Sequence, residues 1–307
     1  MYVIKMKTLI CYFAVFVLTA ASVGIIRLYG GEPTAQTAQT AQTAAETAYA
    51  EGAPSAAAAE TVDVPILMYH NIFRSGKSGK YIVSEEGFEN DLKFLRDNGY
   101  NTVVMQDLID FVYDGKALPE KPVVLSFDDG YFNNYAYAYP LLKKYNARAV
   151  LSIIGYYTDL YTESPDENPR YSHVTWDNVN EMMKSGTVEL QNHSYNLHST
   201  DKGRNGSKKK RGESTEQYRK MLTADLGLLQ TEFREHTGYE PTTYTYPFGS
   251  VSNDSFDIVK DLGFRASLSC ESGMNHLSRG NGECLYMMKR YLRTPSKSAA
   301  DILSKEP

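Results

Sequence analysis

Short apolar runs and amphipathic segments alternate along the chain after residue 60. Runs rich in β-branched and aromatic residues predict buried strands at 64–69, 101–105, 122–127, 148–154, from Val188 onward, 243–246 and 265–269. Segments with apolar residues three or four positions apart predict helices after Ser84 and Ser214 and at 135–145, 175–184 and 255–261. Because strand and helix alternate, we expect parallel strands joined by right-handed crossovers, which predicts an α/β domain.

Two of the predicted helices have recognisable signals at their ends. Ser84 is a favourable N-cap for the first helix, and Gly99 is a favourable stop. Ser214 and Gln217 match a capping box at the start of the longest helix. We therefore expect these two helices to begin directly after the two serines.

The N-terminal segment has a different pattern. Two lysines precede an uncharged, mostly apolar run at 8–26, whose length is near the minimum for crossing a bilayer. This run predicts an uncleaved signal anchor within residues 1–31 that attaches the chain to a membrane. A cleaved signal peptide is the alternative, with Thr-Ala-Ala-Ser at 19–22 as its candidate cleavage site. Both alternatives predict export, either as a membrane-anchored protein that faces outside or as a secreted one.

Residues 32–60 have low complexity. The triplet Thr-Ala-Gln occurs three times at 34–42, an Ala-rich stretch follows, and no large aliphatic residue is present to bury. We expect a disordered, flexible spacer. The remaining residues, 61–307, are enough for one α/β domain with a substantial core.

The composition narrows the class of partner. Charged residues make up 22% of the chain and the net charge is −5, which does not favour a nucleic-acid partner. The 24 tyrosines are amphipathic rings that suit sugar faces as well as ordinary packing. Cys270 and Cys284 are candidates for a disulfide in an oxidising exterior, although spacing alone does not fix the pairing. We expect a monomer.

Two adjacent carboxylates follow a predicted buried strand. The strand at 122–127 is continuously apolar except for Ser126, and Asp128, Asp129 and Gly130 come directly after it. The carboxyl ends of parallel strands are where α/β folds place their active sites. Because adjacent side chains on a strand point in opposite directions, a turn at Gly130 is needed for both carboxylates to serve one site. An Asp-Asp-Gly surface turn is the structural alternative.

Two histidines follow another predicted strand. His193 and His198 are five residues apart, so they would lie about 140° apart on a helix and would not share a face. At a strand end that turns into a loop, both rings can converge. Two imidazoles and one carboxylate leave a fourth position open for water, which is the arrangement of a catalytic zinc site. The sequence therefore predicts a hydrolytic metal centre.

These motifs resemble those of the polysaccharide deacetylases, carbohydrate esterase family 4. Ser-Phe-Asp-Asp-Gly at 126–130 resembles the first signature, 193–198 the second, and Tyr-Thr-Tyr-Pro-Phe-Gly at 244–249 the third. Pro-Ile-Leu-Met-Tyr-His-Asn at 65–71 and the five-residue histidine spacing are similar to the branch that de-N-acetylates poly-β-1,6-N-acetylglucosamine. The resemblance covers roughly 62–295. It implies an irregular (β/α)7 barrel, preceded here by the hydrophobic segment and the disordered linker.

The resemblance also implies roles for individual residues. Asp129, His193 and His198 would bind a divalent metal, with zinc expected and nickel or cobalt also suited to such a ligand set. Asp128 would be the general base that takes a proton from water. The backbone N–H of Phe248 would stabilise the oxyanion.

The third signature departs from the family pattern. The family usually has an arginine two residues before the proline, where it orients the catalytic aspartate, and this chain has Thr245 there. Arg290 or Arg293 is the candidate that supplies this contact from another strand, and we favour Arg290.

The general acid is a second departure, because the Leu-x-His motif of the wider family is absent. In the branch that this chain resembles, a histidine near the start of the domain takes that position, which makes His70 the candidate. Its structural alternative is a histidine hydrogen-bonded at a strand end. His276 is the runner-up, whereas His173 and His236 are interpreted as incidental.

Further residues are candidates for the substrate groove. Tyr131 follows the aspartate pair, and Trp176 stands at a predicted helix start, where a packing role is the alternative. The basic, Gly-rich segment 201–212 begins just after His198 and either borders the groove or is a mobile, solvated loop.

The sequence thus predicts a metal-dependent N-deacetylase that acts on an extracellular N-acetylglucosamine polysaccharide, either poly-N-acetylglucosamine or peptidoglycan. An O-acetyl esterase acting on acetylated xylan and a non-catalytic carbohydrate-binding barrel are the alternatives. A two-metal phosphoesterase would require more carboxylate or histidine ligands than these motifs supply.

Overall fold

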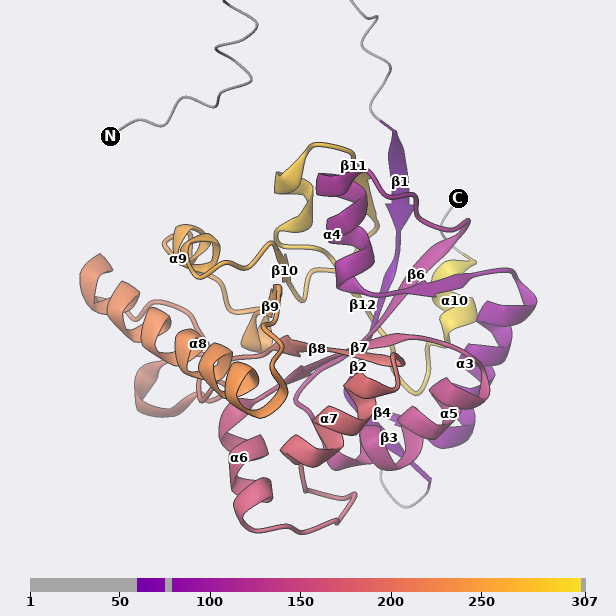
Figure 1. The fold of residues 1–307 in the computed structure, drawn as a ribbon, viewed down its shortest axis with the longest axis horizontal. Coiled ribbons are helices and arrows are strands. Elements are labelled where there is room, and N and C mark those ends of the chain that lie inside the picture. Colours follow the sequence, from indigo (N-terminus) through magenta and orange to yellow (C-terminus); the bar gives the residue numbers. More distant parts are fainter. Residues whose placement is uncertain (1–59, 75–78, 305–307) are drawn as a thin grey trace, which may run out of the picture. The chain divides into compact units, whose positions relative to one another are not determined.

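A curled, parallel β-sheet forms the centre of the computed structural model, which describes residues 60–74 and 79–304 (Figure 1). In spatial order its strands are β10 (Ala266–Leu268), β9 (Thr243–Thr245), β8 (Val188–Asn192), β7 (Ala149–Ile153), β6 (Pro122–Phe127), β2 (Ile66–Tyr69) and β12 (Tyr291–Leu292). β5 (Asn101–Val103) also pairs with β6. An isolated parallel bridge between Leu268 and Met288 links the segment before β12 to β10. The arrangement confirms the predicted irregular (β/α)7 fold.

The two central strands show why the sequence favours this arrangement. Every residue of β6 and of β7 is buried, as expected where helices cover the outside and side chains fill the inside. Their β-branched residues suit this doubly buried environment. Asp128 and Asp129 therefore follow a strand that is packed on both faces.

Helices cover the outside of the sheet (Figure 1). They are α3 (Glu85–Asp97), α4 (Met105–Asp114), α5 (Tyr139–Lys144) with the preceding π-helical turn η1 (Asn134–Ala138), α6 (Gly155–Glu163), α7 (Trp176–Lys184), α8 (Thr215–Thr237), α9 (Ser255–Asp261) and α10 (Ala299–Leu303). Short 3-10 turns cover η2 (Asp201–Gly203), η3 (Pro247–Gly249) and η4 (Gly282–Leu285).

Both predicted N-caps are confirmed. The Ser84 hydroxyl accepts the backbone N–H of Gly87 at 2.9 Å, and α3 begins at the next residue. Ser214 and Gln217 form the reciprocal capping box at the start of α8, with both hydrogen bonds at 3.1 Å. Capping of this kind satisfies backbone donors that the first turn of a helix leaves unpaired.

Several elements were not predicted. The segment 101–105 was expected to be all strand, but β5 ends at Val103 and Met105 begins α4, whose N-cap residue Val104 makes no side-chain capping bond. α6 is rich in tyrosine and lacks a strong helical signal. Two small sheets lie apart from the main one, an antiparallel pair of β1 (Thr61–Val64) with β11 (Asn275–Ser278) and a parallel pair of β3 (Asn71–Phe73) with β4 (Ile82–Ser84).

The predicted signal anchor at 1–31 and the predicted spacer, apart from residue 60, lie outside the described residues, so these remain predictions. In the part of the chain that the structure describes, no helix combines the length and the apolar character needed to cross a bilayer. The longest, α8, has charged residues along much of its length.

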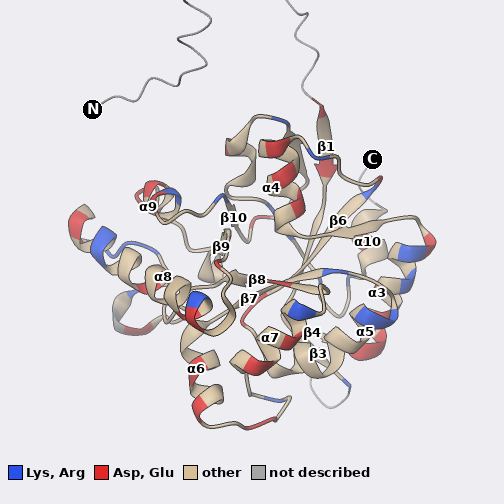
Figure 2. Ribbon diagram, in the orientation of Figure 1, with Lys and Arg blue, Asp and Glu red and all other residues tan. Residues whose placement is uncertain are grey.

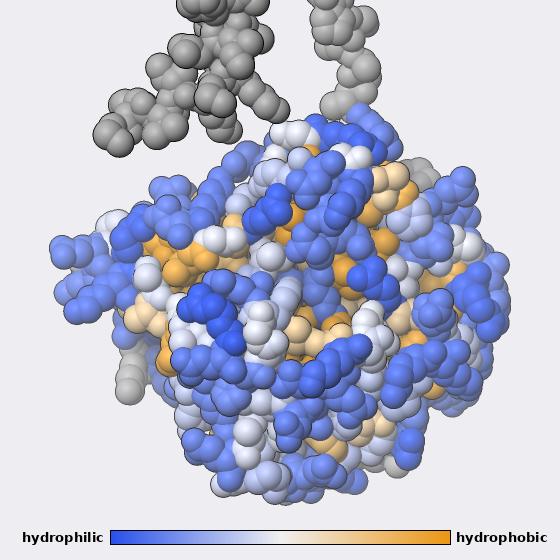
Figure 3. Space-filling model, in the orientation of Figure 1, coloured by the Kyte–Doolittle hydropathy of each residue, from blue (hydrophilic) through white to orange (hydrophobic). Residues whose placement is uncertain are grey.

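Charges of both signs are interspersed over the outer helices (Figure 2). Many form surface ion pairs, such as Lys144 with Glu89 at 2.6 Å and Arg219 with Asp261 at 2.8 Å. Such exposed pairs are screened by water and salt and contribute little to stability. Figure 3 shows a mainly hydrophilic face on which apolar residues form separate patches.

Candidate functional site

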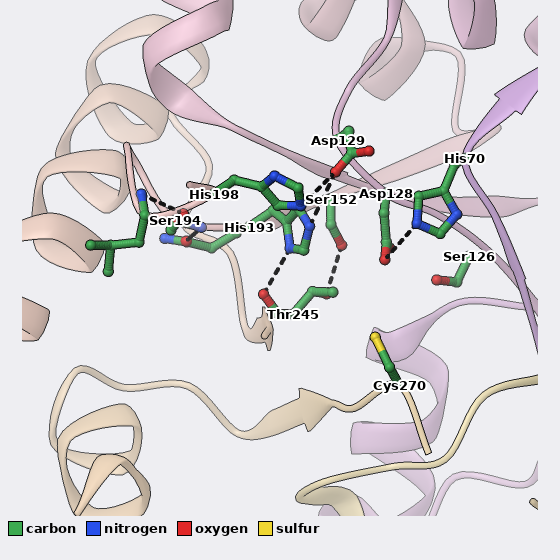
Figure 4. Close-up of polar contacts among 12 residues, drawn as sticks. His70, Ser126, Asp128, Asp129, Ser152, His193, Ser194, His198, Thr245 and Cys270 are labelled. Carbon is green, nitrogen blue, oxygen red and sulfur yellow. Dashed lines mark hydrogen bonds and ion pairs between the residues drawn. The ribbon is translucent and has the colours of Figure 1, made fainter. Parts of the chain in front are cut away.

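The two halves of the predicted metal centre meet at the carboxyl ends of β6 and β8 (Figure 4). Asp129 Oδ1 lies 3.4 Å from His193 Nε2 and 3.2 Å from His198 Nε2. Asp129 and His193 are buried, and His198 is partly exposed. The structure therefore brings together the three residues that the sequence proposed as ligands.

This group of three residues fits a divalent metal. In a tetrahedral zinc site with bonds of about 2.0–2.1 Å, neighbouring ligand atoms lie roughly 3.4 Å apart, which agrees with the 3.4 and 3.2 Å separations in this site. Asp129 Oδ1 is buried and has no hydrogen-bond donor among the described residues. Burial alone would raise the pKa of Asp129, but His193, His70 and His198 outweigh it and hold that pKa well below its usual range. The carboxylate is thus ionised and available as a ligand.

A turn directs the Asp129 carboxylate into the site. Asp129 and Gly130 both have positive φ, at 75° and 72°. A Cβ at Gly130 would come within 3.0 Å of Ile153, so a larger residue there would crowd β7 as well as strain the backbone. Asp129 itself occupies this region although it is not glycine, a strain that is typical of functional sites.

Backbone and side-chain contacts orient His193. Its Nδ1 lies 2.8 Å from the carbonyl oxygen of Thr245 on β9, a contact that Figure 4 shows. A proton on Nδ1 donated to this carbonyl leaves the Nε2 lone pair free for a metal, as is usual for ligand histidines. The Thr245 hydroxyl is in turn 2.7 Å from that of Ser152 on β7.

A partly buried carboxylate shapes the loop that carries His198. Asp225 on α8 accepts the backbone N–H groups of Tyr195 and Asn196 at 2.8 and 2.9 Å. Ser194 has a φ of 73°, and its N–H donates to Asn192 Oδ1 at 2.8 Å. This tight loop explains how histidines five residues apart converge. Sequence reasoning missed Asp225, whose only signal is a carboxylate beside the apolar face of α8.

Arg290 holds the second aspartate. Its two terminal nitrogens donate to the two oxygens of Asp128 at 2.7 and 2.9 Å, and both side chains are almost fully buried. Arg290 also donates to the Ser126 hydroxyl and to the Ser269 carbonyl oxygen. Burial raises the pKa of Asp128, but Arg290, His193 and His70 lower it further, so the pKa lies below its usual value.

Arg290 therefore makes the contact that was proposed for the missing arginine at position 245. Arg293 forms a different buried pair, with its Nε 2.7 Å from Asp91 Oδ2. Asp91 also accepts the backbone N–H of Ala299 at the start of α10. The Asp91–Arg293 pair thus joins α3 to the C-terminal segment and belongs to the structural core.

His70 lies on the other side of Asp128. Its Nε2 is 4.0 Å from Asp128 Oδ2, and its ring packs against Tyr81 with centroids 4.7 Å apart. Burial lowers the pKa of His70 and outweighs the nearby carboxylates. The runner-up, His276, is placed elsewhere: it is exposed on β11 and its Nδ1 is 2.6 Å from Asp63 Oδ1.

Phe248 lies beside the ligand group with a positive φ of 58°. Its ring is 45% exposed and approaches the His198 ring to 4.1 Å between centroids. The segment that carries the proposed oxyanion donor therefore borders the same site. The donor role of its N–H stays a prediction.

Trp176 does not line the groove, so its proposed substrate role is wrong and the packing alternative holds. The side chain is 2% exposed, stacks on His236 and packs edge-on against Phe233. Its Nε1 donates a hydrogen bond to Asp159. Asp159 lies close to Glu232 and His236 on the outer helices. Apolar packing against α8 draws the indole inward.

The remaining predictions have mixed outcomes. Cys270 and Cys284 are free thiols. The basic segment 201–212 is anchored by Lys209, whose ammonium is 2.5 Å from Asp254, and by the buried Ser207. It borders a cavity of about 240 Å³ that Leu197, next to His198, also lines.

One histidine to which the sequence analysis gave no role lies close to the ligand group. His173, interpreted as incidental, pairs with Tyr131 in an antiparallel bridge and stacks on Tyr157. Burial lowers the pKa of His173 to about 4, and the charges of Asp129 and His198 also influence it. No pattern in the sequence indicates that the loop before α7 returns to this site.

Comparisons of the sequence show similarity to polysaccharide deacetylases. The family model for polysaccharide deacetylase matches residues 115–267. The chain is 27% identical over 232 residues to the poly-β-1,6-N-acetyl-D-glucosamine N-deacetylase of Escherichia coli K12, covering 69% of this chain and 34% of that protein. It is 28% identical over 200 residues to a Staphylococcus aureus protein of the same name, covering 65% of each.

A solved structure gives the same picture of the fold. The de-N-acetylase of Aggregatibacter actinomycetemcomitans superposes with a TM-score of 0.67 at 28% identity, covering 79% of this chain and 99% of that one. The chain spans only about a third of the length of the Escherichia coli relative. The region matched by the family model contains Asp128, Asp129, His193 and His198.

Proposed function

Because the chain belongs to the polysaccharide deacetylase family, we propose that it is a metal-dependent hydrolase that removes N-acetyl groups from an extracellular N-acetylglucosamine polysaccharide. The observation that carries this proposal is the pairing of two carboxylates with different environments. Asp129 faces two imidazoles, whereas Asp128 is held by Arg290 and stays outside the ligand group. One carboxylate can therefore bind a metal while its neighbour accepts a proton.

The metal, for which zinc is the first candidate, would be held by Asp129, His193 and His198. When bound, such a metal would act as a Lewis acid that lowers the pKa of a bound water and polarises an acetamide carbonyl. Nickel and cobalt suit the same ligands.

The other residues account for the proton transfers. Asp128, kept ionised by Arg290, accepts a proton from the water that attacks the acetamide carbon. The Phe248 N–H stabilises the negative charge that develops on the carbonyl oxygen. His70, which must first carry a proton, donates it to the departing nitrogen as the C–N bond breaks. The products are acetate and a free amine on the sugar.

Two relatives are named as poly-β-1,6-N-acetyl-D-glucosamine N-deacetylases, and these names support poly-β-1,6-N-acetyl-D-glucosamine as the first candidate substrate. Peptidoglycan is the second N-acetylated candidate. The ligand group recognises an acetyl group and not a linkage, so an O-acetyl ester of xylan would present the same carbonyl chemistry.

Acetate release tests the proposal. We expect purified residues 61–307 to bind one divalent metal per chain and to release acetate from β-1,6-linked N-acetylglucosamine oligomers. A chelator should abolish release, and added Zn²⁺, Ni²⁺ or Co²⁺ should restore it. Parallel assays with peptidoglycan and acetyl-xylan rank the substrates. Absence of acetate from every N-acetylated substrate in the metal-loaded protein would refute the proposed activity.

The location is a separate part of the proposal and is supported by the apolar run at 8–26 alone. We expect the full chain with a C-terminal tag to remain with the membrane fraction and to be degraded by protease added to intact cells. Recovery of the tagged chain from the culture medium would support the cleaved signal peptide, and recovery from the cytoplasm would contradict export.

A further inference from the structure

A group of aromatic rings lies next to the ligand group, and backbone hydrogen bonds join the segments that carry the rings to the ligand-bearing loops. The His173 ring stacks on Tyr157 with centroids 4.4 Å apart and planes 13° apart. Tyr131 and Tyr161 also pack against His173, at 4.7 and 5.7 Å. We call Tyr131, Tyr157, Tyr161 and His173 the aromatic wall.

Backbone hydrogen bonds attach the aromatic wall to the carboxylate half of the site. Gly130 accepts the N–H of Val174 at 2.9 Å, and Phe132 donates to Ser172 at 2.8 Å. His173 and Tyr131 lie between these two bonds as an antiparallel bridge. The wall thus begins two residues after Asp129.

Other hydrogen bonds attach the wall to the imidazole half. At the start of α6, Gly155 and Tyr156 donate their N–H groups to the carbonyl oxygens of Ser194 and Tyr195, at 3.2 and 2.9 Å. These two acceptors lie in the loop between His193 and His198. Tyr157 therefore lies in the first turn of α6, which is bonded to the ligand loop, and the wall is fixed to both halves of the site.

The aromatic wall differs from ordinary core packing in two ways. Tyr131, Tyr157 and Tyr161 keep part of their surface exposed, and the neighbouring Tyr156 is 41% exposed. His173 is 7% exposed, yet its Nδ1 has no hydrogen-bond partner within residues 60–74 and 79–304. Buried polar atoms are normally paired, so an unpaired one beside a catalytic site points to a ligand.

We propose that the aromatic wall is a subsite for one sugar ring of the polysaccharide, adjacent to the ring whose acetamide is cleaved. This inference rests on the proposed function and extends it to recognition of the chain. Tyrosine rings present an apolar face to the C–H groups of a pyranose and a hydroxyl to its polar edge. The wall is therefore expected to favour oligomers over small acetylated compounds.

The test compares a long and a short substrate. Tyr157→Ala is expected to lower kcat/KM for a β-1,6-linked N-acetylglucosamine pentamer roughly tenfold, mainly through KM, in line with the energy of one aromatic contact. The loss should be much smaller for the monosaccharide N-acetylglucosamine, which has no neighbouring sugar ring to place against the wall. Tyr157→Phe, which keeps the ring, should retain most of the preference for the pentamer.

Controls separate this inference from folding and from the proposed function. Tyr100→Ala changes a partly buried tyrosine just before β5, at the opposite end of the strands, and should leave the ratio of the two specificity constants unchanged. Calorimetric titration of the metal-loaded Asp128→Asn chain with the pentamer should show weaker binding when Tyr157→Ala is added. If that variant fails to fold, Tyr157→Leu is used instead.

Two outcomes would overturn the subsite: equal losses on both substrates, or unchanged pentamer binding and KM. A wild-type chain that releases no acetate from any N-acetylated substrate would instead refute the proposed function, before any variant is compared.

Discussion

Asp128→Asn is expected to reduce kcat for acetate release by roughly 10²–10⁴-fold, the usual contribution of a general base. The amide cannot accept a proton from water, although it still offers Arg290 an acceptor of the same shape. Metal content should stay near one ion per chain because Asp128 lies outside the ligand group. Acetate assays and metal analysis of the same preparation measure both effects.

The chain offers a matched control for this substitution. Asp91 pairs with Arg293 at 2.7 Å in an equally buried environment that does not touch the ligand group. Asp91→Asn should therefore lower thermal stability without lowering turnover per folded molecule. Wild-type turnover in Asp128→Asn would show that the proton acceptor is another residue, and loss of the metal would place Asp128 among the ligands.

Local signals explain what the sequence could predict. Asp128 and Asp129 follow a continuous apolar run, and His193 follows another, so the carboxyl ends of two parallel strands already suggested a shared site. The caps at Ser84 and Ser214 are likewise short-range interactions between residues three apart. Resemblance to a family then supplied the order of the motifs and the barrel.

Contacts between distant parts of the chain explain what could not be predicted. Arg290 and Asp128 are 162 positions apart, so their pairing could only be posed as a choice between two arginines. Asp225 serves backbone groups 29 and 30 residues away, a contact that no spacing rule reveals. Trp176 was assigned by residue type, whereas its burial depends on how α7 packs against α8.

Arg290→Met is expected to have the largest effect on stability. It leaves the Asp128 carboxylate buried without its partner, and breaking a buried pair in this way costs about 3–5 kcal/mol. At roughly 2–4 °C per kcal/mol, the melting temperature should fall by about 10 °C. Thermal unfolding followed by circular dichroism measures the shift, with Arg293→Met as the control pair that lies outside the site.

Arg290→Met should also change the pH dependence of turnover. Arg290 lowers the pKa of Asp128, so its removal lets burial raise that pKa. A larger fraction of Asp128 is then protonated at low pH, and activity should be lost there first and recover as the pH rises. An unchanged acidic limb would mean that Arg290 does not set the ionisation of Asp128.

A double substitution separates the effect of the Arg290–Asp128 pair on stability from its effect on catalysis. Arg290→Met combined with Asp128→Leu removes both charges, and apolar replacement of a whole buried pair is often neutral for stability. The double variant should therefore recover much of the melting temperature lost in Arg290→Met, while acetate release stays at the level of Asp128→Asn. If stability did not recover, packing by the long Arg290 side chain, which also contacts Ser126 and Ser269, would outweigh its charge. Recovery of stability without activity would assign the ion pair to holding a catalytic carboxylate that the fold itself does not need.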